Sequence, residues 1–127
     1  MTGCGVLSPG RLRVGAYGQG CVMRAEDRVI AEELKRRVEG TTALVALRVF
    51  GSRARGDADP DSDMDVFVEV EVLDREIRER ILDAAWEVGF SHHMVIAPLV
   101  FSRHEVEDTA MRASPILKAI AEEGVPV

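Results

Sequence analysis

The sequence predicts a single α+β domain in which a small mixed β-sheet is covered by helices, on one side of the sheet. Two observations support this prediction. Segments with the apolar pattern of strands occur between segments with the apolar pattern of helices. The 127 residues are enough to bury one core, and no repeat or linker divides them. We therefore assign residues 23–127 to one domain.

The N-terminal segment has a different composition from the rest of the chain. Residues 1–22 are rich in glycine and contain no apolar run long enough for a signal peptide or a membrane span. We expect them to form a flexible arm, and a mis-assigned start of the chain is the alternative. Cys4 and Cys21 are too few for a disulfide framework or a four-cysteine zinc site. We expect a cytoplasmic protein without a membrane segment.

The first elements of the domain are predicted to be a helix and a buried strand. Residues 25–39 place apolar side chains on one stripe, as in an amphipathic helix, and Gly40 is placed to end it. Residues 43–50 form a nearly continuous apolar run, which is typical of a buried strand. Gly51 and Ser52 interrupt that run, and a single helical turn is expected to follow them.

The second strand is predicted to carry acids on one face. From Asp63 to Val72, apolar residues occupy one parity, while Asp63, Asp65, Glu69 and Glu71 share the other. A helix capped by Asp74 and ended near Gly89 is expected next, followed by a strand over 94–101. A short helix then starts with a capping box at 102–105. The last helix starts at Ser114-Pro115 and stops before Gly124.

The distribution of charge argues against several classes of function. The net charge is −6, and residues 56–127 carry seventeen acidic side chains against six basic ones. This acidic half would repel phosphates, so direct binding of nucleic acid is not expected as the main function. The chain has only one Trp, one Tyr and four Phe. It therefore lacks the aromatic side chains on which RNA-binding sheets stack bases.

The segment that indicates chemistry runs from the end of the first strand into the second. Gly51 has no Cβ, so a phosphate can approach its backbone closely, and Ser52 adds a hydroxyl donor. Arg53 and Arg55 can pair with phosphate oxygens or can simply solvate the turn. Asp63 and Asp65 leave one face of a strand, where a hard cation such as Mg²⁺ would relieve their repulsion. These residues predict a site for a nucleoside triphosphate and magnesium.

This arrangement resembles a known signature. Gly51-Ser52, ten intervening residues and Asp63-Met64-Asp65 are similar to the Gly-Ser…Asp-x-Asp motif of the DNA polymerase β-like nucleotidyltransferase superfamily. The run from Val49 to Gly56 looks most like its minimal nucleotidyltransferase branch. The resemblance implies a polymerase β palm-like fold, an NTP substrate, with ATP as the expected one, and two Mg²⁺ ions held by Asp63 and Asp65 as catalytic residues. Gly51, Ser52, Arg53 and Arg55 would bind the phosphates.

The resemblance also implies a partner. Many minimal members neutralise a HEPN-domain toxin, some by attaching AMP to it, so transfer of an NMP to a protein hydroxyl is the expected activity.

One feature departs from the family. A third carboxylate is expected on residues 94–100, which contain no acid. A weak or inactive module that neutralises a partner by contact is therefore the alternative, and self-association stays open.

His92 and His93 precede the third strand and lack metal-ligand spacing with any cysteine. We interpret them as solvated residues at a strand end. The alternative is that His92 or His93 lies near the proposed nucleotide site.

Overall fold

The computed structural model describes residues 23–108 and 113–127. The predicted arm over residues 1–22 lies outside the described residues. The elements follow in the order α1 (Ala25–Glu39), β2 (Leu44–Phe50), α2 (Ser52–Arg55), β3 (Met64–Val70), α3 (Arg75–Ser91), β4 (Ile96–Ser102), α4 (Arg103–Asp108), α5 (Pro115–Glu123) and β5 (Val125–Pro126). In the part of the chain that is described, no helix is long and apolar enough to cross a membrane.

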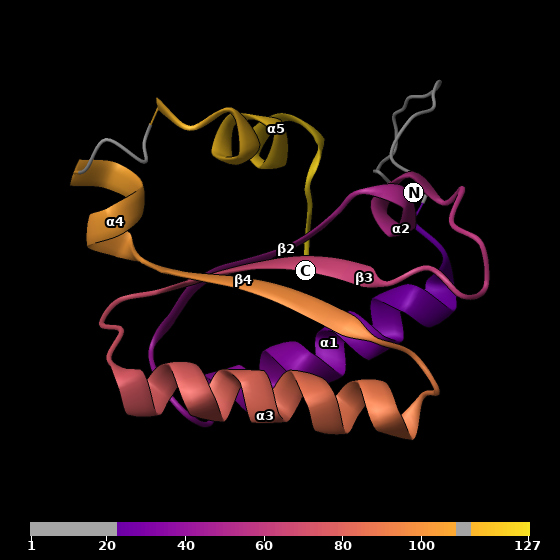
Figure 1. The fold of residues 1–127 in the computed structure, drawn as a ribbon, viewed down its shortest axis with the longest axis horizontal. Helices are drawn as coiled ribbons and strands as arrows, with labels where there is room; N and C mark the ends of the chain where they lie inside the picture. The colour runs from indigo at the N-terminus through magenta and orange to yellow at the C-terminus, as the bar shows by residue number, and fades with distance from the viewer. Residues whose placement is uncertain (1–22, 109–112) are drawn as a thin grey trace.

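The four strands form one mixed sheet in the order β4-β3-β2-β5 (Figure 1). Strand β2 is antiparallel to both of its neighbours, β3 and β5, whereas β3 and β4 run parallel. A parallel pair needs a crossover connection, and α3 provides it. The prediction of a small mixed sheet covered by helices is confirmed.

One face of the sheet packs on α1 and α3, which lie side by side beneath it in Figure 1. The apolar parity of β3 points to this face, because every second residue of a strand lies on the same side. The central residues of this core are fully buried: Leu34, Val38, Val49, Met64, Val66, Val68, Val70, Ile81 and Val88. The amphipathic stripes predicted for both long helices are therefore core surfaces.

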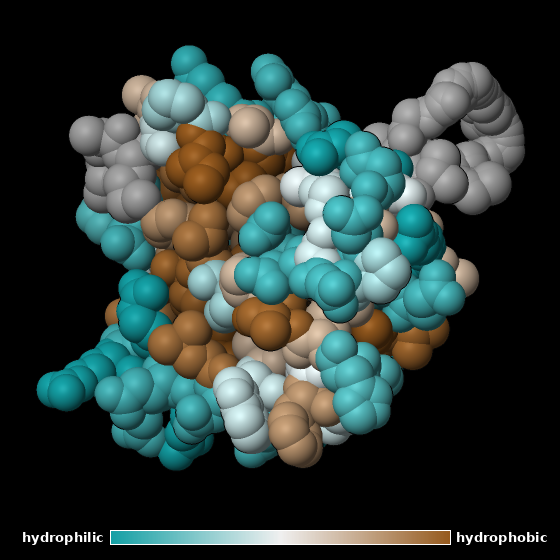
Figure 2. Space-filling model, turned by 45° about the vertical axis from the view of Figure 1, so that its right-hand side comes forward, coloured by the Kyte–Doolittle hydropathy of each residue, from teal (hydrophilic) through white to brown (hydrophobic). Residues whose placement is uncertain are grey.

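The other face is also covered in part, which differs from the prediction of helices on one side only. Helix α5 lies over this face in Figure 1, and Phe67 packs there against Leu117 and Ile120 in a second, smaller core. Phe67 is the apolar residue among the acids of β3, and its burial requires a cover. Apolar surface nevertheless remains exposed on the face shown in Figure 2, where it is bordered by hydrophilic residues.

The strands β2, β3 and β4 differ by one to two residues from the predicted ranges, the end of α3 lies beyond Gly89, and β5 was not predicted. Helix α3 continues through Gly89 to Ser91, and a Cβ at Gly89 would lie 2.5 Å from the carbonyl oxygen of Met94. This glycine therefore allows the next segment to pack closely and does not end the helix. Strand β5 has only two residues, too few for a periodic pattern, and it pairs with Arg48 and Val49 of β2.

The predicted caps are present at two helices. The Asp74 side chain accepts a hydrogen bond of 2.8 Å from the Ile77 amide at the start of α3. At α4, the Ser102 amide donates to Glu105 and the Glu105 amide donates to Ser102 Oγ, which is a complete capping box. These caps fix where α3 begins and where the chain leaves β4.

Candidate active site

The Gly-Ser segment and the acidic strand meet at one edge of the sheet. Phe50, the last residue of β2, pairs with Asp65 of β3. Gly51 follows with φ 76° and ψ −154°, a conformation that side-chain-bearing residues rarely adopt. A Cβ at Gly51 would lie 2.7 Å from Asp65 Oδ2. The backbone at Gly51 therefore lies against the carboxylate, and a side chain at position 51 would have to displace it.

Ser52 begins α2, a single turn closed by Gly56 in the left-handed conformation. The first backbone N–H groups of a helix have no partner within the helix. Those of α2 start beside Asp65, because Gly51 is in contact with it. The predicted helical turn after the Gly-Ser pair is confirmed, and it places the Ser52 hydroxyl at the same edge of the sheet as the two acids.

Asp63 directly precedes β3, and Asp65 is the second residue of that strand, on the face away from α1 and α3. Asp63 is exposed, and Asp65 is partly buried. Burial, together with the neighbouring charge of Asp63, raises the pKa of Asp65. The charges of the two carboxylates therefore interact.

Arg53 has a different environment from the one predicted. Its guanidinium is 5% exposed, and Nη1 donates to both carboxylate oxygens of the fully buried Asp27, at 3.2 and 3.4 Å. Nη2 donates to the carbonyl oxygens of Pro60 and Ser62, at 3.2 and 2.9 Å. The side chain predicted to contact phosphate is therefore directed into the protein, where it joins α1, α2 and the loop that leads to Asp63.

Arg55 is exposed and forms an ion pair with Asp57, with 3.3 Å between Nε and Oδ2. Exposed pairs of this kind contribute little to stability. Arg55 is therefore the arginine of α2 that is free to turn toward a phosphate.

A sequence profile of the nucleotidyltransferase domain family matches residues 28–123, which is more than half of the chain. The chain belongs to this family. The match includes the Gly51-Ser52 segment and both aspartates, and it supports the resemblance to the polymerase β-like superfamily. No curated protein matches the chain. Membership implies an NTP as substrate and NMP transfer as the general reaction.

Strand β4 of this nucleotidyltransferase domain carries no acid next to the aspartate pair. The parallel register places Ala97 opposite Asp65, and Met64 donates its amide to the carbonyl of Val95. Among the described residues, no three His, Cys, Asp or Glu side chains gather as a metal site. Glu69 is buried further along β3, and Glu71 pairs with Arg103, so neither completes the pair.

The pairing of Asp27 with Arg53 was not predicted from the sequence. An acid in the first turn of a helix is common, because it interacts well with the helix dipole. Its spacing carried a further signal, since Asp27 precedes Ala31 and Leu34 by four and seven residues and so lies on the core stripe. A carboxylate on that stripe requires a buried cation, which is Arg53.

Proposed function

We propose that this domain transfers an NMP, preferentially AMP from ATP, to a hydroxyl group on a partner protein in a Mg²⁺-dependent reaction. The observation that carries this proposal is the contact between the Gly51 backbone and the Asp65 carboxylate. It brings a place for phosphate oxygens directly beside a pair of acids, which is the arrangement that phosphoryl chemistry requires.

The aspartate pair fits magnesium by its chemistry. Hard divalent cations prefer carboxylate oxygens and commonly take one or two from the protein, with substrate phosphates completing the set. Burial and the neighbouring charge of Asp63 raise the pKa of Asp65, and a cation bound beside it would favour the ionised form. Asp63 and Asp65 would hold the ion, and when bound it would neutralise charge on the phosphates and on the attacking oxygen.

The residues of the chain itself position the reactants. Ser52 and the backbone at Gly51 bind the triphosphate, and Arg55 is placed to pair with its outer oxygens. The acceptor hydroxyl oxygen then forms a bond to the α-phosphorus, while the bond from that phosphorus to the bridging oxygen of the β-phosphate breaks. Pyrophosphate leaves, and the hydroxyl proton passes to water.

A protein hydroxyl is the proposed acceptor because the run from Val49 to Gly56 resembles that of minimal nucleotidyltransferases, some of which attach AMP to a protein partner. By its resemblance to minimal nucleotidyltransferases, we propose a HEPN-domain toxin as the partner, with this chain as the antitoxin. The cytoplasm, where ATP is available, is the proposed location.

The test is transfer of label from ATP carrying a radioactive α-phosphate. Purified protein, Mg²⁺ and this ATP are incubated with a lysate of the host, beside an Asp63→Asn variant. We expect label on one discrete protein, and we expect no label with the variant or with a chelator. Equal labelling by the variant would contradict the assignment of Asp63, and absence of label on any macromolecule would contradict the transferase proposal.

The second candidate is an inactive module that neutralises its partner by contact. The observation in its favour is Ala97, which stands beside Asp65 where an acid is expected. In that case, Asp63→Asn would neutralise a co-expressed toxin as well as the native chain does. Loss of neutralisation by this variant, with its fold and its partner binding intact, would exclude the module and support transfer.

A further inference from the structure

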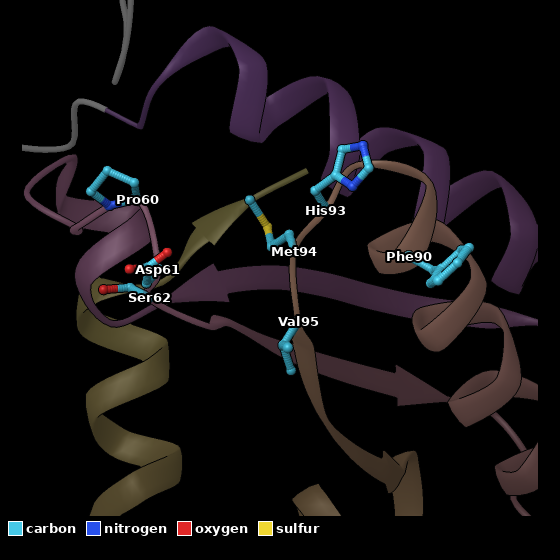
Figure 3. A pocket seen from close by; sticks show the side chains of 7 residues that line it. All are labelled: Pro60, Asp61, Ser62, Phe90, His93, Met94 and Val95. Carbon is cyan, nitrogen blue, oxygen red and sulfur yellow. The ribbon is translucent and has the colours of Figure 1, made fainter.

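We infer that a cavity between the loop before Asp63 and the turn from α3 to β4 is the acceptor subsite, which holds the hydroxyl-bearing segment of the partner protein. This inference rests on the proposed function, and it assigns the binding site of the second substrate, the acceptor protein, to this cavity. The cavity has a volume of about 340 Å³ and is lined by Pro60, Asp61, Ser62, Phe90, His93, Met94 and Val95. Figure 3 shows these side chains approaching it from two separate segments.

The order of the strands determines the side from which an acceptor can approach. The proposed phosphate-binding segment Gly51-Ser52 follows β2, and the aspartate pair lies directly before β3 and on its second residue. Strand β4 is the other neighbour of β3. In an in-line displacement the attacking oxygen and the leaving pyrophosphate stand on opposite sides of the phosphorus. With the triphosphate bound at Gly51-Ser52, as proposed, pyrophosphate would leave on the β2 side, so the opposite approach lies toward β4, and the cavity is at the start of β4.

The cavity is also next to the reacting centre along the chain. Ser62, one of its walls, directly precedes Asp63, and Val95, on the opposite wall, accepts a hydrogen bond from the Met64 amide. The walls combine apolar groups from Pro60, Phe90, Met94 and Val95 with polar groups from Asp61, Ser62 and His93. A mainly apolar pocket with a few polar groups is suited to an organic side chain.

His93 forms part of the turn that walls one side of the cavity. Its φ is 57°, and it is the only described residue other than glycine with a positive φ. The Met94 amide donates to the Gly89 carbonyl and the His93 amide donates to the Phe90 carbonyl. This is a Schellman motif, in which the position of His93 is normally glycine. A histidine therefore occupies a position that favours glycine, and its side chain lines the cavity.

The exposed surface beside the cavity indicates that the acceptor is larger than the cavity itself. Phe90 is 70% exposed and stacks on Trp86, which is 67% exposed, with ring centroids 5.1 Å apart. The apolar surface therefore continues from the cavity along α3. Contiguous exposed aromatic residues are typical of protein contact sites. The cavity thus has an adjoining surface on which a protein acceptor can rest.

The experiment compares Val95→Arg with Val72→Arg. Val95 is 62% exposed inside the cavity, and Val72 is 67% exposed outside it, so both variants should fold. Binding of Mg²⁺-ATP is measured by equilibrium dialysis, and transfer is measured with the labelled ATP and lysate described above. We expect Val95→Arg to lower transfer about tenfold or more without changing ATP binding, and Val72→Arg to change neither.

The possible results are distinguishable. Normal transfer by Val95→Arg would overturn the subsite and leave the proposed function intact. Loss of ATP binding by Val95→Arg would also overturn it, because the cavity would then belong to the nucleotide. Absence of transfer by the native chain would overturn the proposed function, and the subsite with it.

A second variant covers the case in which Val95→Arg does not fold. His93→Gly replaces a side chain at a position that favours glycine, so its Tm should be equal to or above that of the native chain. We expect transfer to fall several-fold while ATP binding is unchanged. A stable variant with native transfer would show that the histidine does not contribute to the acceptor site.

Discussion

Gly51 combines a backbone conformation and a contact that no other residue can supply together. Its φ of 76° with ψ of −154° is open almost only to glycine, and Asp65 Oδ2 occupies the space where a Cβ would lie. The Gly-Ser segment was predictable as a phosphate site from the sequence. Its direct contact with the carboxylate was not, because that depends on the pairing of Phe50 with Asp65.

Replacement of this glycine should therefore affect both stability and function. We expect Gly51→Ala to lower the free energy of unfolding by about 1–3 kcal/mol, from backbone strain alone. Transfer should be lost, because the new methyl group displaces Asp65. Urea unfolding and labelled-ATP transfer measure the two effects, with Gly40→Ala as the control, since its Cβ would meet only ordinary contacts at 3.5 Å and beyond.

Arg53 and Asp27 form the ion pair most isolated from water among the described residues, at 5% and 1% exposure. Removal of one partner leaves the other charge buried. Arg53→Met should therefore destabilise the fold by about 3–5 kcal/mol. The double variant Arg53→Met, Asp27→Leu should recover much of that stability but not transfer, because the loop before Asp63 loses the bonds to Pro60 and Ser62. Recovery of transfer together with stability would show that these two bonds are dispensable.

Glu69 makes the stability of the protein depend on pH. Burial, reinforced by the charge of Glu107, raises its pKa above the ordinary value of 4.5. The folded protein then holds this proton more tightly than the unfolded chain, so the ionised carboxylate lowers stability above the raised pKa. Below pH 4.5 both states are protonated and the effect vanishes.

Glu69→Gln should accordingly raise Tm at pH 8 and leave it unchanged at pH 4. Thermal unfolding followed by circular dichroism at both pH values measures this. A shift of equal size at the two pH values would assign the effect to packing instead of charge.

At the scale of elements, the sequence predicted most of the secondary structure because the periodic patterns are strong. The bounds of α1 agree with prediction, and the two capping interactions begin α3 and α4 where expected. The predicted end of α3 was wrong because a glycine such as Gly89 can either end a helix or allow another segment to pack closely. Only the position of Met94 in the structure shows that Gly89 allows close packing. Pairing of β5 with β2 depends on tertiary contacts, which local patterns do not encode.

The register of β3 and β4 suggests a gain-of-function variant. Ala97 stands opposite Asp65 and is only partly buried, so a carboxylate there can be solvated or bind a cation. We expect Ala97→Asp to increase Mg²⁺ affinity and to raise the transfer rate about tenfold or more, as an added ligand for the proposed site. Isothermal titration with Mg²⁺ and the labelling assay measure both. Unchanged values would show that β4 does not border the ion.

At the scale of the whole molecule, the sheet has a fully packed face and a partly covered one. The packed face was predictable, because its side chains follow simple alternation along β3. The partial cover of the second face was not predictable from the sequence. The acids on that face have the pattern of a solvated surface, and α5 covers only the region around Phe67. The proposed site lies on the uncovered part of this face, where side chains remain accessible to a ligand.

Binding of nucleotide should therefore stabilise the whole domain. A ligand at one hundred times its dissociation constant adds about 2.7 kcal/mol to the free energy of unfolding. We expect Mg²⁺-ATP to raise Tm by several degrees, and Mg²⁺ or ATP alone to have less effect. Asp63→Asn should abolish the gain in a thermal-shift assay. Equal stabilisation of both proteins would place the nucleotide elsewhere.

The stacked ring on Phe90 has a practical consequence. Trp86 is the only tryptophan of the chain, so the intrinsic fluorescence of the protein reports on one position. That position adjoins a residue that lines the cavity at the start of β4. Emission from an exposed indole shifts to shorter wavelength when water is displaced from it. The native chain therefore carries its own optical reporter of a partner on α3, and it needs no attached dye.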